Sequence, residues 1–268
     1  MIFHYLKIAF RNLCKHKTQN IISIIGLAVG LLCFCVCIYC SRFVESTDHC
    51  FANHDRIAEL NLYDGKADRY FSGSPVPLAE DLRTWALGET EAISSVTYPR
   101  ERPYYVELSP EKTLPYELET IEIDTCYNKI FTPELVAGHW KMASQSLNSV
   151  ILSQSMAIKI FGNAESAIGK HMTLMRRLNT SPESTPKTGG IVYTIQAVMK
   201  DIPLNNSLDF MQNIDMLTVN DSEGLLQSSK RHNMTGANTY VLLSPQTTCT
   251  DLEKQFSKRD YTYTLYGE

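Results

Sequence analysis

The hydrophobic pattern of the chain is dominated by one run, Ile21–Cys40, which contains no charged residue and no proline. As a helix with a rise of about 1.5 Å per residue, this run is about 30 Å long, which matches the hydrocarbon thickness of a bilayer. A spanning segment must be helical, because lipid offers no partner to unpaired backbone groups. A buried core helix is the alternative, but such a helix rarely stays apolar on every face over this length. The pattern therefore predicts a transmembrane helix at residues 20–41.

The segment before the span, residues 1–19, predicts an amphipathic helix. Apolar side chains recur there at helical spacing, and Lys7, Arg11 and Lys15 form a basic row at i, i+4 and i+8. A helix of this kind lies in the membrane surface, with its basic side chains near anionic headgroups. The alternative is a solvated flank that only sets the membrane topology.

Beyond the span, residues 42–268 mix short strand patterns with short helical ones, which predicts an α+β body. The clearest helix is Gln154–Phe161, because Ser153 can cap its start and Gly162 can follow its end. Another helix is predicted from Phe43 to Arg56. Further strands are predicted at residues 57–63, 93–98, 104–108, 116–123, 150–152, 171–175, 191–199, 210–219 and 240–243, and further helices at residues 78–85 and 248–256. Residues 179–190, rich in Pro, Gly, Ser and Thr, have the composition of a mobile loop.

The distribution of charge sets the orientation. The first 20 residues carry four basic side chains and no acidic one, whereas all 29 Asp and Glu residues lie beyond the span, where the net charge is −8. The positive-inside rule then predicts a cytoplasmic N-terminus and an extracytoplasmic body. The apolar core is too long for a signal peptide and no small-x-small cleavage site follows it, so we expect a retained anchor.

The body shows no residue pattern typical of a catalytic or metal site. Its histidines lack HExxH spacing, and there is no Gly-x-Ser-x-Gly elbow and no phosphate-binding loop. The cysteines of the body lack metal-ligand spacing; they are Cys50, Cys126 and Cys249. The mild acidity argues against nucleic acid. We therefore expect no enzyme, no metal and no cofactor bound by this chain.

Polar residues near the end of the body are expected to be structural. Asp201 and Asp209 are more typical of strand ends or turns than of an acid–base pair. The triplet Asn205–Ser207 is expected to form a turn through local hydrogen bonds to the backbone. Within the span, by contrast, Gly26 and Gly30 are four residues apart and permit close approach by another helix. We expect this glycine pair to face a partner helix.

Several sequence blocks, in this order and spacing, resemble a known family. They are Tyr5–Leu13 with Ile24–Gly30, Asn53–Ile57 with Pro77–Leu82, Ser149–Ser153 with Ala157–Gly162 and Ile168–Lys170, and Tyr193–Pro203 with Asn206–Ser207 and Thr239–Leu243. Together they make the chain similar to the N-terminal part of a MacB/FtsX-type ABC transporter permease, of the kind found in Bacteroidetes. The resemblance implies a MacB-like extracytoplasmic core domain with a porter-like α/β part and an inserted second subdomain, roughly at residues 110–205.

The resemblance also implies a function. Such permeases are homodimers of the bacterial inner membrane that relay ATP-driven motion to the outside, for export or mechanotransmission, and a separate or fused cytoplasmic ABC ATPase binds the ATP. They carry three more spans after the domain, and this chain reaches Glu268 without them, so we expect a fragment or a truncated gene product. Its expected partners are the ATPase, a second permease copy or the C-terminal helices, and membrane lipid. The alternative is a single-span sensor or partner-binding module without an ATPase.

Overall fold

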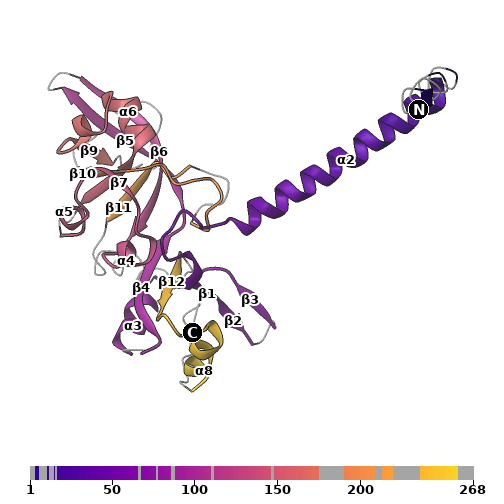
Figure 1. Ribbon diagram of the computed structural model, residues 1–268. Helices are drawn as coiled ribbons and strands as arrows, with labels where there is room; N and C mark the ends of the chain where they lie inside the picture. The colour runs from indigo at the N-terminus through magenta and orange to yellow at the C-terminus, as the bar shows by residue number, and fades with distance from the viewer. Residues whose placement is uncertain are drawn as a thin grey trace. The chain divides into compact units, whose positions relative to one another are not determined.

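The computed structural model describes residues 4, 5, 11, 15, 17–65, 68–76, 78–85, 88–109, 112–145, 148–174, 190–208, 213–219 and 236–258. The chain divides into two compact units, Met1–Thr47 and Asp48–Glu268 (Figure 1). Lys7, Asp209 and nearly all of the loop predicted at residues 179–190 lie outside the described residues. The predicted division of residues 42–268 into a porter-like part and an inserted part stays a prediction.

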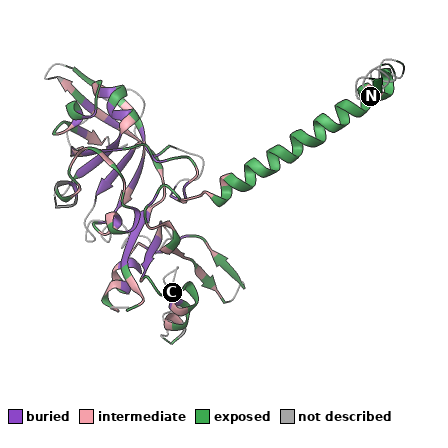
Figure 2. Ribbon diagram, viewed as in Figure 1, coloured by how far each residue is buried: buried purple, intermediate pink, exposed green. Residues whose placement is uncertain are grey.

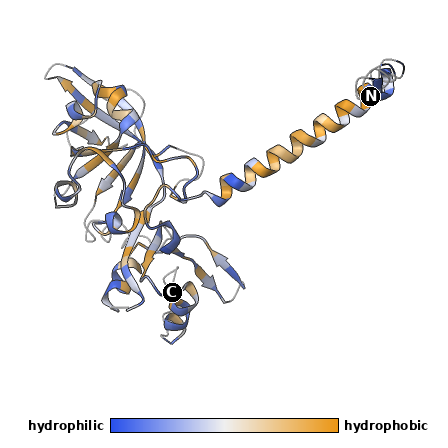
Figure 3. Cartoon of the chain, viewed as in Figure 1, coloured by the Kyte–Doolittle hydropathy of each residue, from blue (hydrophilic) through white to orange (hydrophobic). Residues whose placement is uncertain are grey.

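The first unit is built on one long helix, α2 (Lys17–Glu45), which contains the predicted span. None of its residues is buried, and its surface is apolar over most of its length (Figures 2 and 3). The helix is long and apolar enough to cross a membrane. Before it, Arg11 and Lys15 are helical and exposed.

The helix predicted from Phe43 to Arg56 was wrong. Helix α2 ends at Glu45, and only a short 3-10 helix, η1 (His54–Arg56), follows a series of turns. Asp48 interrupts the helix because its backbone is left-handed, with φ +64°. A helix cannot continue through such a residue.

The second unit contains a ten-stranded sheet in the order β1-β12-β4-β6-β11-β8-β10-β9-β5, with β7 paired to β10. Its strands are β1 (Ile57–Leu60), β4 (Thr90–Thr97), β5 (Arg100–Ser109), β6 (Lys112–Ile123), β7 (Leu135–Gly138), β8 (Ser149–Ser153), β9 (His171–Leu174), β10 (Ile191–Met199), β11 (Met216–Val219) and β12 (Ala237–Leu243). Strand β5 pairs with β6 as well as with β9, so the six strands from β6 to β5 close into a ring. A separate ribbon consists of β2 (Leu62–Asp64) and β3 (Arg69–Phe71).

Short helices cover this sheet. They are α3 (Leu78–Thr84), α4 (Tyr127–Phe131), α5 (Trp140–Gln145), α6 (Gln154–Phe161) and α8 (Cys249–Ser257), with the 3-10 turn η2 (Glu165–Ala167). The predicted bounds and caps of α6 are confirmed. Ser153 accepts a hydrogen bond from the Met156 amide at its start, and Gly162 closes it with φ +88°. The predicted strand Ile191–Met199 is also confirmed with its bounds.

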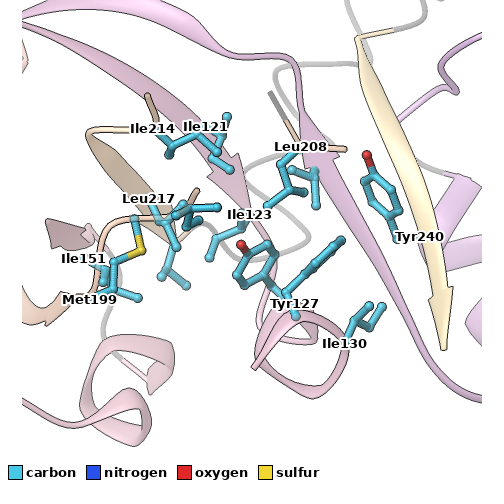
Figure 4. Packing of buried hydrophobic residues seen from close by; sticks show 14 of the residues in the cluster. Ile121, Ile123, Tyr127, Ile130, Ile151, Met199, Leu208, Ile214, Leu217 and Tyr240 are labelled. Carbon is cyan, nitrogen blue, oxygen red and sulfur yellow. The ribbon is translucent and has the colours of Figure 1, made fainter. Parts of the chain in front are cut away.

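Three apolar clusters form the core (Figure 2). One draws on all six strands of the ring and on α6, so it fills the space that they enclose. A second, partly drawn in Figure 4, includes Ile121, Ile123 and Leu217 from the opposite face of the same sheet, together with α4. The third lies between α3, α8 and the strands β1, β4 and β12. The predicted α+β class, with one apolar N-terminal helix ahead of a sheet-rich domain, is confirmed.

Candidate functional site

A network of polar contacts surrounds the point where the chain enters its large domain. We call it the junction: the incoming segment Asp48–Ile57 and the clamp loop Pro203–Leu208. Two of the sequence blocks quoted above lie in these segments, although Asp48 and Ser207 are 159 residues apart in the chain.

Asp48 fastens the incoming segment to the clamp loop. Its carboxylate Oδ1 accepts a hydrogen bond from the Ser207 amide at 2.7 Å, and its own amide donates to the Asn205 carbonyl at 3.1 Å. A hydrogen bond to an ionised acceptor is roughly twice as strong as a neutral one. The left-handed backbone of Asp48 is therefore held in place by the loop that it binds.

The clamp loop is itself rigid. Asn206 is fully buried; its Nδ2 donates to the Pro203 carbonyl at 2.6 Å, and its Oδ1 accepts from the Leu208 amide at 2.9 Å. The Tyr240 hydroxyl from β12 donates to the Ser207 carbonyl at 3.3 Å. The predicted turn at residues 205–207 is confirmed.

The nearby Asp201 is also structural, as predicted. Its carboxylate accepts the Ser155 amide at 3.0 Å, in the first turn of α6. An acceptor at that position satisfies one of the unpaired N–H groups of the helix start. It therefore serves α6 rather than an acid–base pair.

Beneath the junction, Phe51 inserts into an aromatic cluster. Its ring meets Phe131 of α4 edge-on at 4.9 Å, and Phe131 contacts Tyr127 at 4.8 Å and Tyr240 at 5.0 Å. Burial raises the pKa of the Tyr127 and Tyr240 hydroxyls well above their ordinary value, so both stay neutral. Figure 4 shows these two tyrosines among the apolar side chains of the core. The cluster packs the incoming segment and supplies no acid or base.

Two further contacts tie the incoming segment to the sheet. The Asn53 side chain donates to the Lys129 carbonyl in α4 at 3.3 Å. The Arg56 guanidinium donates to the Leu243 carbonyl at the end of β12 at 2.9 Å and pairs with Glu91 of β4 at 3.0 Å. These contacts join the incoming segment to α4, β4 and β12.

A second polar node lies at the end of β6. The Asp124 carboxylate is buried and accepts hydrogen bonds from the Ser94 hydroxyl at 2.7 Å, from the Ser95 and Cys126 amides at 3.0 Å each, and from the Arg83 guanidinium. Burial lowers the pKa of Arg83, but the Asp124 charge, the neighbouring Cys126 and the hydrogen bonds to Asp124 and Glu80 together outweigh this, and the net pKa is raised. Every lone pair of the carboxylate is occupied, so the node joins α3 to β4 and β6 and is not arranged for catalysis.

Potentially reactive side chains do not gather. Within the described part of the chain, no group of three or more His, Cys, Asp and Glu side chains could hold a metal ion. The rings of His49 and His54 lie 4.3 Å apart at a tilt of 37°, and His54 pairs with Asp55. Burial, followed by the Asp48 charge, raises the pKa of the Cys50 thiol to about 11, which disfavours a reactive thiolate there.

The site residues predicted from sequence lie apart from the junction. Gly26 and Gly30 are exposed on α2, with open space where a Cβ would stand. Their packing against a partner helix stays a prediction, as does the membrane role of Lys7, Arg11 and Lys15. The residues that form the junction and the node were not predicted as sites, although the blocks Asn53–Ile57 and Asn206–Ser207 marked two of the segments that meet.

Comparison with known proteins assigns the chain to a family. Residues 21–259 match the family described as the MacB-like periplasmic core domain. A domain of a protein assigned as a permease from Porphyromonas gingivalis is similar in structure, with a TM-score of 0.57 and 24% sequence identity over 78% of this chain and 87% of that chain. No curated protein matches the chain.

Two transporter domains are also similar. The periplasmic region of MacB from Actinobacillus actinomycetemcomitans has a TM-score of 0.49 and 14% identity over 80% of this chain and 86% of that one. The extracellular domain of the ABC-type transporter YknZ from Gram-positive bacteria has a TM-score of 0.43 and 13% identity over 74% and 87%.

Proposed function

Because the chain belongs to the MacB-like periplasmic core domain family, we propose that it is the N-terminal portion of an ABC transporter permease. In this proposal it relays ATP-driven motion from the membrane to its extracytoplasmic domain, for export or mechanotransmission. Its own role is non-catalytic. The observation that carries the proposal is the junction, where Asp48 is bonded to the clamp loop and Phe51 is packed in the core.

The junction suits a relay because it is stiff. A flexible linker after α2 would absorb a displacement of the helix end through backbone rotation. Here the residue that follows the last turns of α2 is fixed by two hydrogen bonds to the clamp loop. Three residues later a buried ring fixes the chain again, and Asn53 and Arg56 reach α4 and β12. The chain is therefore held at several points where it enters the domain, which supports a relay of movement from the membrane side.

The proposal assigns partners by chemistry. The sequence has no phosphate-binding loop, so a cytoplasmic ABC ATPase would bind the ATP. A second permease copy, or further transmembrane helices, would pack on the Gly26/Gly30 face of α2. The basic N-terminal flank supports a cytoplasmic N-terminus in the bacterial inner membrane and an extracytoplasmic domain.

The orientation is tested by labelling thiols from one side. Cys249 is exposed in the large domain, and a thiol introduced by Lys15→Cys would lie before the span. Each is kept as the single cysteine of its variant, with the other native cysteines, Cys14 among them, replaced by Ser or Ala. In spheroplasts, a membrane-impermeant maleimide should label Cys249 and reach Lys15→Cys only after the membrane is opened. The reverse pattern would overturn the orientation.

The relay is tested by breaking the clamp. Asp48→Gly removes the carboxylate but keeps the left-handed backbone accessible, because glycine adopts positive φ without strain. Asp55→Ala is the matched control, since Asp55 is exposed and pairs only locally with His54. Each variant is tagged, purified from its native membranes with bound proteins, and spin-labelled at Val192→Cys, an exposed position at the start of β10.

ATP with vanadate should change the distance between the labels of two copies in the parent and in Asp55→Ala, and should change it much less in Asp48→Gly. If Asp48→Gly responds like the parent, the junction does not carry the relay. If no ATPase co-purifies and no nucleotide changes the distance, the single-span sensor or partner-binding module replaces the permease.

A further inference from the structure

We infer that the outer edge of β1 binds a segment of the same chain, residues 261–266, as an antiparallel strand that completes this side of the sheet. The segment follows the described residues, the last of which is Lys258. The inference goes beyond the proposed function and does not rest on it, because it assigns an interaction surface within the large domain and names the occupant of that surface.

Strand β1 is an edge strand. Among the described strands it pairs only with β12, and it stands at the end of the order of the ten-stranded sheet. In an antiparallel pair, alternate residues direct their N–H and C=O groups away from the partner, so within the described part of the chain β1 presents unpaired backbone groups on its outer side. All four of its residues are half-buried, and Glu59 is the only charged one. A partly apolar edge of this kind is a template for a further strand.

The order of the elements indicates where that strand comes from. After β1 the chain passes through the β2–β3 ribbon and α3 to β4, and β12 lies between β1 and β4 and runs antiparallel to both. This arrangement is half of a split β-α-β fold, in which a second half begins with the central strand and continues through a helix into one more strand. The chain supplies β12, then α8, and then residues 261–266.

The handedness of such connections places the new strand beyond β1. Helices α3 and α8 pack on the same face of β1, β4 and β12, where they form the third apolar cluster (Figure 1). Crossover connections between parallel strands are right-handed in almost all proteins. Because β12 runs opposite to β1, a right-handed crossover through α8 crosses the sheet in the direction opposite to the crossover through α3. It therefore leads from β12 past β1, and not past β4.

Residues 261–266 have the sequence of a half-buried strand. They read Tyr-Thr-Tyr-Thr-Leu-Tyr, which are residue types that favour strands or tolerate them, and they include no charge, proline or glycine. Tyr261, Tyr263 and Leu265 alternate with threonines and therefore share one face. That face suits the third apolar cluster, against which Ala58 and Leu60 of β1 pack.

The connection to the edge of β1 is of ordinary length. Helix α8 ends at Ser257, and its Phe256 packs against the third cluster together with β1. Residues 258–260 then connect the helix to the strand, within the range of about 2–6 residues that is common for such loops. An antiparallel strand runs from the Leu60 end of β1 to its Ile57 end. The segment therefore ends beside the junction, where the chain enters β1.

Disulfide cross-linking in the purified full chain tests the pairing. All eight native cysteines are replaced by Ser or Ala, and Glu59→Cys places one thiol on the face of β1 away from the third cluster. The second thiol is placed by Thr262→Cys, Tyr263→Cys or Thr264→Cys. Glu91→Cys in β4 is the matched control, because it replaces a glutamate on the other strand that flanks β12. Thermal melting shows whether each variant keeps the parental fold.

Oxidation should link Glu59→Cys to position 262 or 264 several-fold more than to position 263, because directly opposed side chains of one face lie within disulfide reach. Peptide mass spectrometry identifies each link, and a non-reducing gel separates links within one chain from links between copies. The inference is overturned if no link forms, if the three positions link equally as in an unpaired tail, or if position 263 is preferred. Links that form only between two copies, or only to Glu91→Cys, also overturn it.

Hydrogen exchange tests the same pairing without any substitution. In the parent chain, the amide hydrogens of residues 262–266 should exchange several-fold more slowly than those of a synthetic peptide with the same sequence, because a paired strand protects its amides. Equal exchange in the two would contradict the inference. None of these outcomes bears on the relay, which is tested separately at Asp48.

Discussion

The buried node at Asp124 leads to a sharp prediction for the stability of the domain. Asp124→Asn keeps the shape of the side chain but replaces one carboxylate oxygen with an NH₂ group. Oδ2 accepts from the Ser95 amide and the Arg83 guanidinium. In the variant, an NH₂ in this position would face two donors, and the half-buried Arg83 would lose its buried counter-charge and keep only the more exposed Glu80. Breaking a buried ion pair by removing one partner costs about 3–5 kcal/mol.

The two tryptophans make this cost measurable. Trp85 follows α3, which carries Arg83, and Trp140 stacks on Tyr127 of α4, which begins three residues after Asp124. Thermal unfolding followed by tryptophan fluorescence in detergent should therefore report on the elements that the node joins. For a domain of this size, each kcal/mol lowers Tm by about 2–4 °C, so Asp124→Asn should lower it by about 6–20 °C.

Glu80→Gln is the matched control. Glu80 pairs with the same guanidinium at 2.8 Å but is 44% exposed, and an exposed ion pair contributes about 0.2–1 kcal/mol. We expect its Tm to stay within about 4 °C of the parent. Equal Tm values for the two variants would refute the reasoning, because the larger loss of stability in Asp124→Asn is attributed to the burial of Asp124 and not to its charge alone.

Three further predictions concern single positions. Burial, and then the neighbouring Asp48 carboxylate, raises the pKa of Glu59 in the folded domain above its ordinary value of 4.5. The domain is therefore more stable when Glu59 is protonated, and this stability is lost as pH rises through the folded pKa. In urea unfolding, Glu59→Gln should therefore stabilise the domain at pH 7, by under about 1 kcal/mol after solvent screening. Below pH 4.5 the substitution should have no effect on stability, and an equal effect at both pH values would contradict this. Gly138→Ala would place a Cβ against a β10 carbonyl oxygen at φ +79°, which should lower the free energy of unfolding by about 2–5 kcal/mol. Gly162→Ala, at φ +88° in open space, should lower it by about 1–2 kcal/mol in the same assay. Similar losses for the two variants would show that the close contact does not matter. Replacing both Gly26 and Gly30 with Leu should weaken self-association in lipid, and unchanged association would rule out the proposed packing face.

The sequence allowed prediction wherever the determining chemistry is local. The cap and C-terminal glycine of α6 lie within ten residues, and both were predicted with the helix bounds. Strand β10 was predicted because its nine residues are mostly apolar or β-branched, with only Thr194 and Gln196 as polar residues, and lie between Gly190 and Lys200. The apolar helix needed only length and composition. In each case the information lies in one short window of the chain.

Features that depend on distant residues could not be predicted in this way. Asp48 ends the helical region through a bond to Ser207, and no local signal distinguishes it from the surrounding polar residues. The Arg83–Asp124 pair joins residues that are 41 apart, and the ring closes because β5 pairs with both β6 and β9. Such pairings follow from packing of the whole domain. The strand predicted at residues 57–63 is divided into β1 and the start of β2, and β3 and β7 were missed. Strand β7 is defined by its pairing with β10, more than 50 residues further along the chain.

The place of β12 in the sheet has a consequence for biosynthesis. This strand lies between β1 and β4, yet of the described strands it comes last along the chain. During synthesis at about 5–20 residues per second, the edge of β4 waits about 7–30 s before β12 is complete. An unpaired strand edge is a template for association with other chains throughout that interval. This part of the domain therefore cannot complete its fold progressively from the N-terminus. It is finished in one late step, and a nascent chain interrupted before residue 237 leaves β1 and β4 unjoined, open to proteolysis and aggregation.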